Sequence, residues 1–351
     1  MITTIVLPKI IQFEKRPSGQ LRPLLTALSA PGHYLMVVDN STLEVGTRCP
    51  TAYFYNCVLR REAFARNAAL TFGGAIHKGI EALLRGADKS TQDDIVARYF
   101  AENPTPPDEY RTLPAALQIL KHYRIRATFP DYEWDILSHE GAPVIERPFE
   151  IPLGTLEINH DISLPDWPEP QFVKIIHVAW SGRIDLVAHT MGHNRVIDHK
   201  TTSIGGDRFS QPFFLSHQAI GYTWAAQQLY PELNIDSFCV NAIFYKKPVG
   251  TGPIDKPGPR GGTPALDFFR VHYTYSQDRI TEWERNCMTI IEDLVHCIVR
   301  NSYPMFTYNC FNKFGRCQYY DVCTLESREV RRRMITSDAF TNVTWAPTLD
   351  E

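Results

Sequence analysis

One stretch constrains the fold of this chain more than any other: GRIDLVAHTMGHNRVIDHKTT, residues 182–202. Two runs rich in β-branched residues flank residues 191–192, and this pattern predicts an antiparallel hairpin with a tight turn. Asp185 and Asp198 are equidistant from that turn. An unbulged register therefore places them opposite each other, with Cβ atoms about 4.5–5.5 Å apart. Lys200 lies two residues beyond Asp198 and shares its face.

Two carboxylates so close together repel each other unless a cation lies between them. Oxygen ligands suit a hard cation such as Mg²⁺ or Mn²⁺. A lysine beside a bound metal can orient a water molecule or stabilise the charge that develops on a phosphoryl group. The alternative is a surface hairpin with solvated, paired charges. The hairpin alone does not decide between these two interpretations.

The order of the other patterns predicts an α/β domain with a mixed sheet, not a regularly alternating one. Helical periodicity occupies three early segments: 49–85, 90–100 and 113–128. Strand-like patterns follow at 142–153, 174–189, 194–203, 237–247 and 268–276. Two more helical patterns lie among them, at 214–230 and 278–300. We predict an N-terminal lead-in at 1–48, a main domain at 49–330 and a C-terminal tail at 331–351. A Pro/Gly-rich insertion lies within the main domain, at about 247–264.

The charge balance limits how this chain could meet nucleic acid. The formal net charge is -3 across 351 residues, so no overall basic field coats nucleic acid indiscriminately. A nucleic-acid partner would have to meet a local patch. The run REVRRR at 328–333 is a candidate for phosphate contacts, although a solvated charge run is the commoner meaning of such a sequence.

The chain has eight cysteines, an even number that invites a disulfide interpretation. The first 19 residues lack the charged start and apolar stretch of a signal peptide. No window approaches the roughly 18 apolar residues of a membrane span. We therefore expect a cytoplasmic protein without a membrane partner, whose thiols stay reduced and serve as core residues, metal ligands or catalytic groups.

Three cysteines near the C-terminus form the sequence NCFNKFGRCQYYDVC. Cys310, Cys317 and Cys323 within fourteen residues of a reduced chain suggest a metal or cluster site that lacks one ligand. Their spacing matches neither a zinc ribbon nor a ferredoxin. Cys49, directly before Pro50 at a helix start, is well placed to be the fourth ligand. The other candidates are Cys57, Cys239, Cys287 and Cys297.

Two expected helices carry polar pairs at a spacing of four, which puts each pair on one helix face. His77 and Glu81 form one pair, and Gln218 and Tyr222 form the other. An amide and a phenol can give neutral hydrogen bonds to phosphate oxygens or to a catalytic side chain. Taken alone, each pair is explained equally well by packing and solvation.

Together these elements resemble the PD-(D/E)xK nuclease superfamily, and most of all its RecB-like exonucleases, including phage and CRISPR-associated types. GRID before the turn and IDHKT after it are similar to the active-site hairpin of that family. The resemblance implies a restriction-endonuclease-like fold. It also implies that Asp185 and Asp198 bind divalent metal and that Lys200 assists the attack of water on a phosphodiester.

The resemblance extends to both helices and to the cysteines. Gly73 to His77 matches a G-x-x-x-H element whose histidine joins the metal site in the family. Gln218 and Tyr222 match a Q-x-x-x-Y element that sets the lysine and the substrate backbone. Some RecB-like nucleases, including the AddB type, hold a [4Fe–4S] cluster with one cysteine before these motifs and three after. This implies a cluster on Cys49, Cys310, Cys317 and Cys323 that joins the two ends of the domain. The wide gap between Cys310 and Cys317 departs from the family pattern and keeps zinc as an alternative.

The resemblance thus implies a metal-dependent deoxyribonuclease, an exonuclease of recombination, repair or phage replication, located in the host cytoplasm if a phage encodes it. Its partners would be DNA and a helicase, recombination or replication protein. No G-x-x-x-x-G-K-[ST] occurs, so helicase activity would belong to such a partner. The rival hypothesis is a non-catalytic DNA-binding or assembly subunit that keeps the fold and the cluster.

Overall fold

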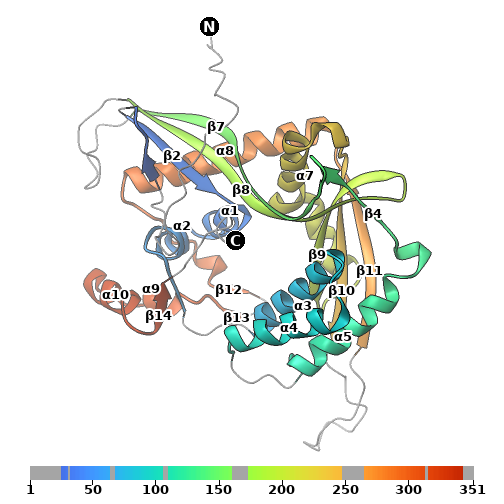
Figure 1. Ribbon diagram of the computed structural model, residues 1–351. Helices are drawn as coiled ribbons and strands as arrows, with labels where there is room; N and C mark the ends of the chain where they lie inside the picture. Colours follow the sequence, from blue (N-terminus) through green and yellow to red (C-terminus); the bar gives the residue numbers. More distant parts are fainter. Residues whose placement is uncertain are drawn as a thin grey trace, which may run out of the picture.

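The computed structural model describes residues 25–30, 32–63, 68–105, 110–159, 173–246, 265–312 and 315–342. Figure 1 shows a twisted sheet with helices on both sides and a smaller helical region beside it. The expected α/β class with a mixed central sheet is confirmed. Of the described helices, none combines the length and the apolar character needed to cross a bilayer.

The main sheet runs in the order β1-β2-β8-β9-β10-β11, and β7 and β4 also pair with β8. The pairs β2–β8 and β9–β10 are parallel, while β1–β2, β7–β8, β4–β8, β8–β9 and β10–β11 are antiparallel. The strands are β1 (Leu25–Ala27), β2 (His33–Val38), β4 (Asp135–Ile136), β7 (Ile145–Asn159), β8 (Val173–Thr190), β9 (His193–Thr202), β10 (Ser237–Lys246) and β11 (Ala265–Thr274).

The predicted hairpin is formed by β8 and β9, and its register is confirmed from the turn to Leu186 but not at the two aspartates. Thr190 pairs with His193, and the ladder continues to Leu186 opposite Ile197. Met191 and Gly192 have φ values of 50° and 76°, as the two central positions of a type I′ turn require. The ladder stops one pair before the two aspartates. From there β9 continues beside β10, and β8 runs beside β2 and β7. The sheet therefore forks at the predicted site.

Two helical layers cover opposite faces of the sheet. One layer packs on β10 and β11 through a core that includes Ile76, Leu120 and Ile243. The other packs on β2, β7 and β8 through a larger core that includes Trp180, Trp224 and Trp283. The first layer contains α3 (Ala68–Leu84), α4 (Lys89–Glu102) and α5 (Leu113–Arg126), and the second α1 (Asn40–Arg48), α7 (His217–Leu229) and α8 (Gln277–Val299).

The smaller region joins segments from both ends of the described chain. It is built from α2 (Pro50–Tyr53), the π-helical turn η1 (Phe54–Val58), β3 (Arg61–Ala63), β12 (Phe311–Asn312), β13 (Gly315–Arg316), α9 (Tyr320–Cys323), α10 (Arg328–Ile335) and β14 (Phe340–Asn342). Tyr55, Tyr319 and Ile335 pack in its core, and β14 pairs with β3. A separate antiparallel pair is formed by β5 (Ser138–His139) and β6 (Ala142–Pro143). The short helix α6 spans Asp207–Ser210.

Elements of the fold also lie inside the expected lead-in and tail. Residues 33–38, inside the expected lead-in, form β2, which is central to the sheet and almost wholly buried because it pairs with β8. The expected tail begins inside α10. The Pro/Gly-rich insertion at about 247–264 and the last residues of the tail lie outside the described residues.

Candidate functional site

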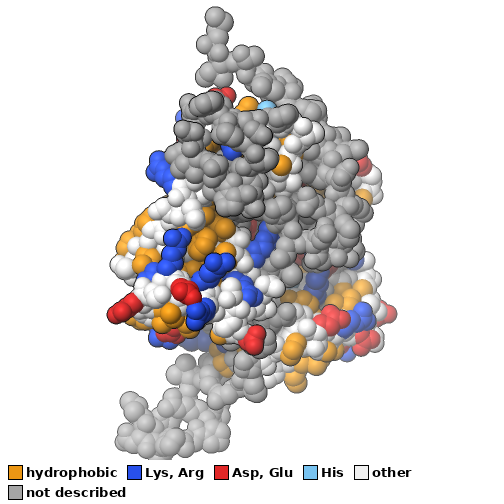
Figure 2. Space-filling model, turned by 90° about the vertical axis from the view of Figure 1, so that its left-hand side faces the viewer, with side chains coloured by type: hydrophobic (Ala, Val, Ile, Leu, Met, Phe, Trp, Pro, Cys, Tyr) orange, Lys and Arg blue, Asp and Glu red, His pale blue; other side chains and the backbone are white. Residues whose placement is uncertain are grey.

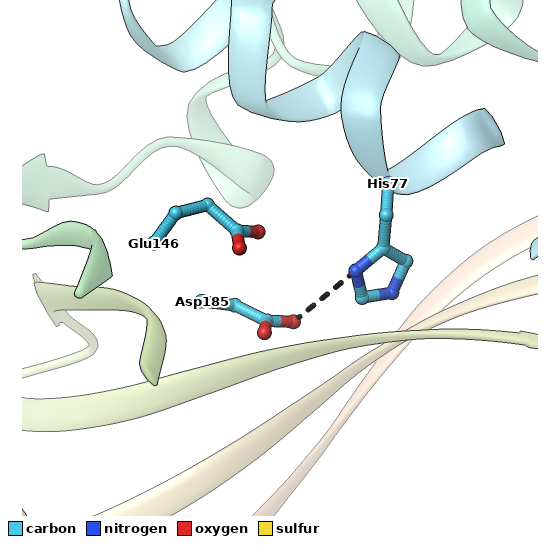
Figure 3. Close-up of side chains that lie close together, drawn as sticks. All are labelled: His77, Glu146 and Asp185. Atoms are coloured by element: carbon cyan, nitrogen blue, oxygen red, sulfur yellow. Dashed lines mark ion pairs between the residues drawn. The ribbon is translucent and has the colours of Figure 1, made fainter. Parts of the chain in front are cut away.

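Three side chains converge at the fork between β8 and β9. His77 on α3, Glu146 on β7 and Asp185 on β8 each offer a ligand atom, and these atoms all lie within 4.8 Å of one another. Figure 3 shows the imidazole and the two carboxylates pointing toward a common centre. The Nδ1 atom of His77 lies 3.6 Å from Oδ2 of Asp185. The structure thus brings two predicted residues together with a third that the sequence patterns did not single out.

Glu146 belongs at this site because of strand register. Ile145 pairs with Leu186 and Arg147 with Ile184, so Glu146 lies across from Asp185. Its φ of 48° is a left-handed conformation that few non-glycine residues adopt, and its own position is missing from the ladder. One sequence signal existed, a glutamate within an otherwise strand-like run. Only the pairing of β7 with β8 shows which aspartate it faces.

The charges at this site explain why it would bind a cation. Burial, with the neighbouring carboxylates of Asp185 and Glu81, raises the pKa of Glu146 to about 8. Lys78 and Arg183 only partly oppose this rise. A divalent ion among these ligands would relieve the repulsion, since opposite charge favours the ionised form. The residues present therefore fit a metal with nitrogen and oxygen ligands.

Backbone groups of β9 complete this side of the fork. The N–H of His199 donates to Oδ2 of Asp185 over 2.9 Å. The carbonyl oxygen of His199 contacts Nε2 of His77. The strand thus turns one carbonyl and one amide toward the converging side chains, which holds Asp185 in place.

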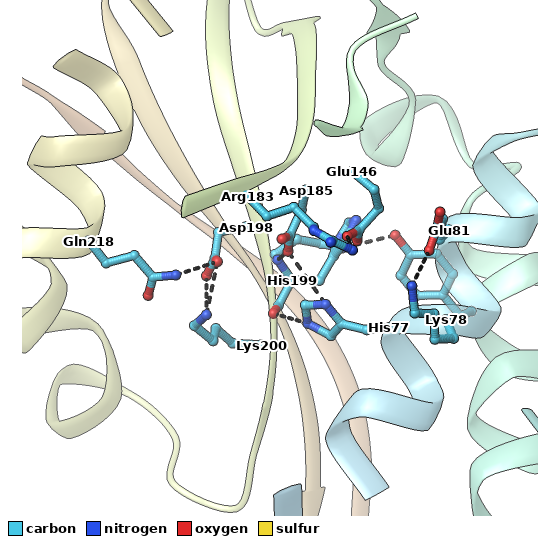
Figure 4. A network of polar contacts seen from close by, with 12 residues as sticks. His77, Lys78, Glu81, Glu146, Arg183, Asp185, Asp198, His199, Lys200 and Gln218 are labelled. Carbon is cyan, nitrogen blue, oxygen red and sulfur yellow. Dashed lines mark hydrogen bonds and ion pairs between the residues drawn. The ribbon is translucent and has the colours of Figure 1, made fainter. Parts of the chain in front are cut away.

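Asp198, Lys200 and Gln218 form a second polar group, on the other side of the fork (Figure 4). The Nζ atom of Lys200 lies 2.9 Å from Oδ1 and 2.8 Å from Oδ2 of Asp198. Gln218 on α7 donates to the same Oδ1 over 3.0 Å. Asp198 is buried, and it is not among the residues that converge with His77. The structure therefore presents Asp198 as the partner of the lysine.

The lysine keeps its charge in this environment. Burial disfavours the ammonium form of Lys200, but the carboxylates of Asp198 and Asp185 outweigh burial and raise its pKa. Burial also raises the pKa of Asp198, and Lys200 opposes that rise. A charged ammonium held by a buried carboxylate is oriented for contact with an anion. Its own side chain remains partly exposed, at 31%.

Tyr222 lies one turn after Gln218 and packs beneath the fork. Its ring meets Phe149 edge to face at 5.5 Å, and its pKa is raised by burial and by the nearby aspartates. A Cβ atom on Gly182 would lie 2.8 Å from the Tyr222 hydroxyl oxygen. The glycine of GRID is thus required by this close approach. Tyr222 is a neutral phenol that supports the strand carrying Asp185.

Glu81, predicted to share a face of α3 with His77, forms ion pairs outside the converging group. It accepts from Lys78 and from Arg85, each over 3.0 Å. It lies outside the converging group but contributes to the raised pKa of Glu146. Glu81 is therefore part of the charged surroundings of the site.

A buried polar network that the sequence patterns did not reveal supports β9 from beneath. Asn241 on β10 donates to Nδ1 of His199 and to the Tyr123 hydroxyl, each over 2.9 Å, and accepts from the Tyr132 hydroxyl. Burial, first among several causes, lowers the pKa of His199 to about 3, so its imidazole is neutral. The network fixes the ring, and with it the backbone that touches Asp185.

The four predicted cluster cysteines line one cavity of about 610 Å³ in the smaller region. The backbone N–H of Cys317 donates to the Cys310 carbonyl over 2.8 Å, which closes the loop between them. Cys49 reaches this cavity from the start of α2, and Cys323 from α9. Cys57, Cys239, Cys287 and Cys297, which the sequence left as other candidates, do not line it. None of the eight cysteines forms a disulfide.

The sulfur atoms of this quartet lie farther apart than the ligand atoms of a single metal ion do. Among the described residues, no three of these cysteines have sulfur atoms that all lie within 4.8 Å of one another. A tetrahedral zinc ion with Zn–S bonds of about 2.3 Å needs all its sulfur atoms closer than that. Burial and the thiols of Cys317, Cys49 and Cys310 raise the pKa of Cys323 to about 11. At neutral pH Cys323 is therefore a neutral thiol, and only a bound cation would favour its thiolate.

Comparison with known proteins agrees with the geometry at the fork. A search of curated proteins found no match to the chain. A sequence model of the PD-(D/E)XK nuclease superfamily matches residues 40–324, which include α3, the hairpin, α7 and all four cluster cysteines. By that match, which spans most of its length, the chain belongs to the PD-(D/E)XK nuclease superfamily.

Proposed function

We propose that this protein is a metal-dependent DNA nuclease, of the RecB-like exonuclease type, that hydrolyses phosphodiester bonds. Members of the superfamily are typically metal-dependent nucleases and commonly use Mg²⁺ or Mn²⁺. One observation carries the proposal. His77, Glu146 and Asp185 converge within 4.8 Å, next to a lysine that a buried aspartate holds in its charged form.

His77, Glu146 and Asp185 would hold the metal, which when bound polarises the phosphate and lowers the pKa of water. Lys200, oriented by Asp198 and Gln218, would donate to a phosphate oxygen or position the attacking water. As the new P–O bond forms, the bond to the leaving oxygen breaks and that oxygen takes up a proton. The additional role of Asp198 as a metal ligand, predicted from the hairpin, stays a prediction.

The ligand set supports Mn²⁺ more strongly than Mg²⁺. Mg²⁺ prefers oxygen ligands and keeps several of its waters, whereas one of the three side chains here is an imidazole. We therefore expect Mn²⁺ to bind more tightly, and His77→Asp to narrow the difference in affinity between the two ions.

The direct test incubates the purified protein with Mg²⁺ or Mn²⁺ on single-stranded and double-stranded DNA. Asp185→Asn and Lys200→Ala should each reduce the cleavage rate by about 100-fold or more. Lys121→Ala, an exposed lysine on α5, is the matched control and should cleave normally. If the wild type leaves DNA intact, or both site variants cut at the control rate, the enzymatic proposal is wrong. The rival, a non-catalytic DNA-binding or assembly subunit, would then take its place.

The cysteine quartet is the second part of the proposal, with a [4Fe–4S] cluster bound by Cys49, Cys310, Cys317 and Cys323. The cluster would staple two segments about 260 residues apart, which restricts the unfolded chain. Anaerobically purified protein should absorb near 400 nm. Cys310→Ser should abolish this band, and Cys297→Ser should keep it. A colourless protein with one zinc per chain would show that the metal is zinc.

The exonuclease assignment and the cellular setting follow from the same resemblance. We propose action on DNA in recombination, repair or phage replication, within a reducing cytoplasm that keeps the thiols available. A helicase, recombination or replication protein would open the duplex, since the sequence has no Walker motif. Circular and linear DNA offered side by side separate the two modes of cleavage. An exonuclease degrades only the linear molecule.

A further inference from the structure

We infer that the rim of the cysteine-lined cavity is a binding surface for single-stranded DNA, where bases stack on exposed aromatic rings. The aromatic rim is defined as four residues that line the cavity, Arg48, Met305, Phe311 and Arg316, together with Tyr308, which stacks on the lining residue Phe306. The inference deepens the proposed nuclease function and rests on it.

Three of the five rim residues are large, exposed apolar side chains. Tyr308 is 76% exposed and Phe311 is 61% exposed, while Met305 is 46% exposed. Within the described residues, these three are among only eleven large hydrophobic side chains that are exposed. Exposed apolar side chains that gather in one place mark an interaction site more often than scattered ones do.

The rings are held in position by aromatic neighbours. Tyr308 stacks on Phe306, with centroids 6.0 Å apart and ring planes 12° apart. Phe311 meets Tyr320 edge to face at 5.0 Å. Each exposed ring is therefore backed by a second ring and needs little ordering before a base stacks on it. Such platforms bind single strands with little sequence preference, because every base has a π-face.

Charge complementarity identifies the partner as nucleic acid. Residues 300–335 contain seven Lys and Arg against three Asp and Glu, a net charge of +4 in a chain whose total is -3. Arg48 and Arg316, the two cationic residues of the rim, line the cavity. The helix α10, which carries REVRRR, packs against the same small core. Figure 2 shows Lys and Arg side chains gathered with hydrophobic ones on this side of the molecule. A single-stranded nucleic acid fits both the exposed rings, through its bases, and the positive charge, through its phosphates. A protein partner would explain the exposed apolar side chains but does not require the positive charge.

The test measures binding without cleavage, by fluorescence anisotropy of labelled oligo(dT) and of a blunt duplex in Ca²⁺ buffer. The protein is the full chain purified anaerobically. The double variant Tyr308→Ala/Phe311→Ala should weaken oligo(dT) binding about tenfold or more. Tyr308→Phe should bind as the wild type does, because it keeps the ring. Leu70→Ala removes a side chain as exposed as Tyr308 and is the matched control.

Each outcome has a defined meaning. Unchanged oligo(dT) affinity in the double variant, with Leu70→Ala as reference, overturns the inference and leaves a protein-docking face as the explanation of the rim. An equal loss for the blunt duplex also overturns it, because paired bases offer no free π-faces. The absorbance near 400 nm and the metal content of the double variant are also measured. If both equal those of the wild type, collapse of the cavity is excluded as the cause of weaker binding. Cleavage is measured in a separate assay. A wild-type protein that does not cleave DNA there would contradict the nuclease proposal, not the binding inference.

Discussion

Glu146 on β7 lies across from Asp185 on β8, at a position that the ladder between these strands skips and where the backbone is left-handed. The two carboxylates lie 39 residues apart on two consecutive strands, and His77 joins them from α3. This relationship makes Glu146 the most informative residue to change.

Glu146→Gln should reduce Mn²⁺ affinity and cleavage together, each by about 10- to 100-fold, since it removes one of three charged or nitrogen ligands. The metal-free variant should be more thermostable than the metal-free wild type at pH 8, because a neutral amide does not repel Asp185. Isothermal titration with Mn²⁺ and thermal melts in EDTA measure the two effects. Glu150→Gln, on the same strand, is the control. A variant that binds Mn²⁺ as tightly as the control would exclude Glu146 as a ligand.

Gln218→Ala should lower kcat about tenfold with little change in KM. The substitution removes a hydrogen bond to the same oxygen of Asp198 that holds Lys200, so the lysine loses its fixed orientation. Gln228 on the same helix is exposed, and Gln228→Ala should be unchanged. Steady-state kinetics on one DNA substrate compare the two. Equal kcat values would show that Gln218 does not position the lysine.

Asn241→Leu should lower the free energy of unfolding by about 2–3 kcal/mol, because it leaves His199 and two tyrosine hydroxyls without their buried partner. Asn286→Leu on the exposed side of α8 should change stability little. Urea denaturation of the metal-free proteins gives both values. A loss no greater than that of the control would mean that water replaces the amide.

Met191→Asn should stabilise the hairpin by about 1 kcal/mol, since asparagine tolerates the left-handed conformation better than methionine does. Gly192→Ala should have the opposite sign, because its φ of 76° strains any side chain. The midpoints of urea denaturation rank the three proteins. Both substitutions shifting the midpoint the same way would contradict the turn assignment.

His272 predicts a pH dependence of stability away from the metal site. Burial, helped by Arg195, Arg270 and His193, lowers its pKa to about 4. Between pH 6.5 and 4 the unfolded chain therefore binds a proton that the folded chain does not, so stability falls as the pH falls. His272→Gln should remove about 1 kcal/mol of that loss, after allowance for solvent screening. Melting curves at pH 7.5 and 5 test this. Parallel pH profiles for the two proteins would contradict it.

The parts of the fold that could be predicted are those with local signals. The type I′ turn and the register to Leu186 follow from β-branched runs around a glycine, and α7 and α8 follow from apolar periodicity. The helix expected over 90–100 begins one residue earlier, at Lys89, because Asp88 caps it by accepting a hydrogen bond from the Thr91 N–H. Such local rules act over a few residues, and they end where strands from distant segments meet.

The parts that could not be predicted depend on long-range pairing. Whether β2 joins the sheet is decided by its parallel pairing with β8, about 140 residues away. The divergence of β8 and β9 at the aspartates separates Asp185 from Asp198, which simple hairpin geometry places together. Glu146 enters the site for the same reason. A strand pattern tells which residues share a face but not which strand lies beside it.

The pairing of β3 with β14 has a consequence for synthesis. Ala63 pairs with Phe340, which the ribosome adds 277 positions later. At about 5–20 residues per second, the earlier strand waits roughly 14–55 s for its partner. During that interval β3 presents an open edge, the kind of surface on which nascent chains associate wrongly. Closure of the small region, and any loading of the four thiols, must therefore wait until β14 has been synthesised, long after β3.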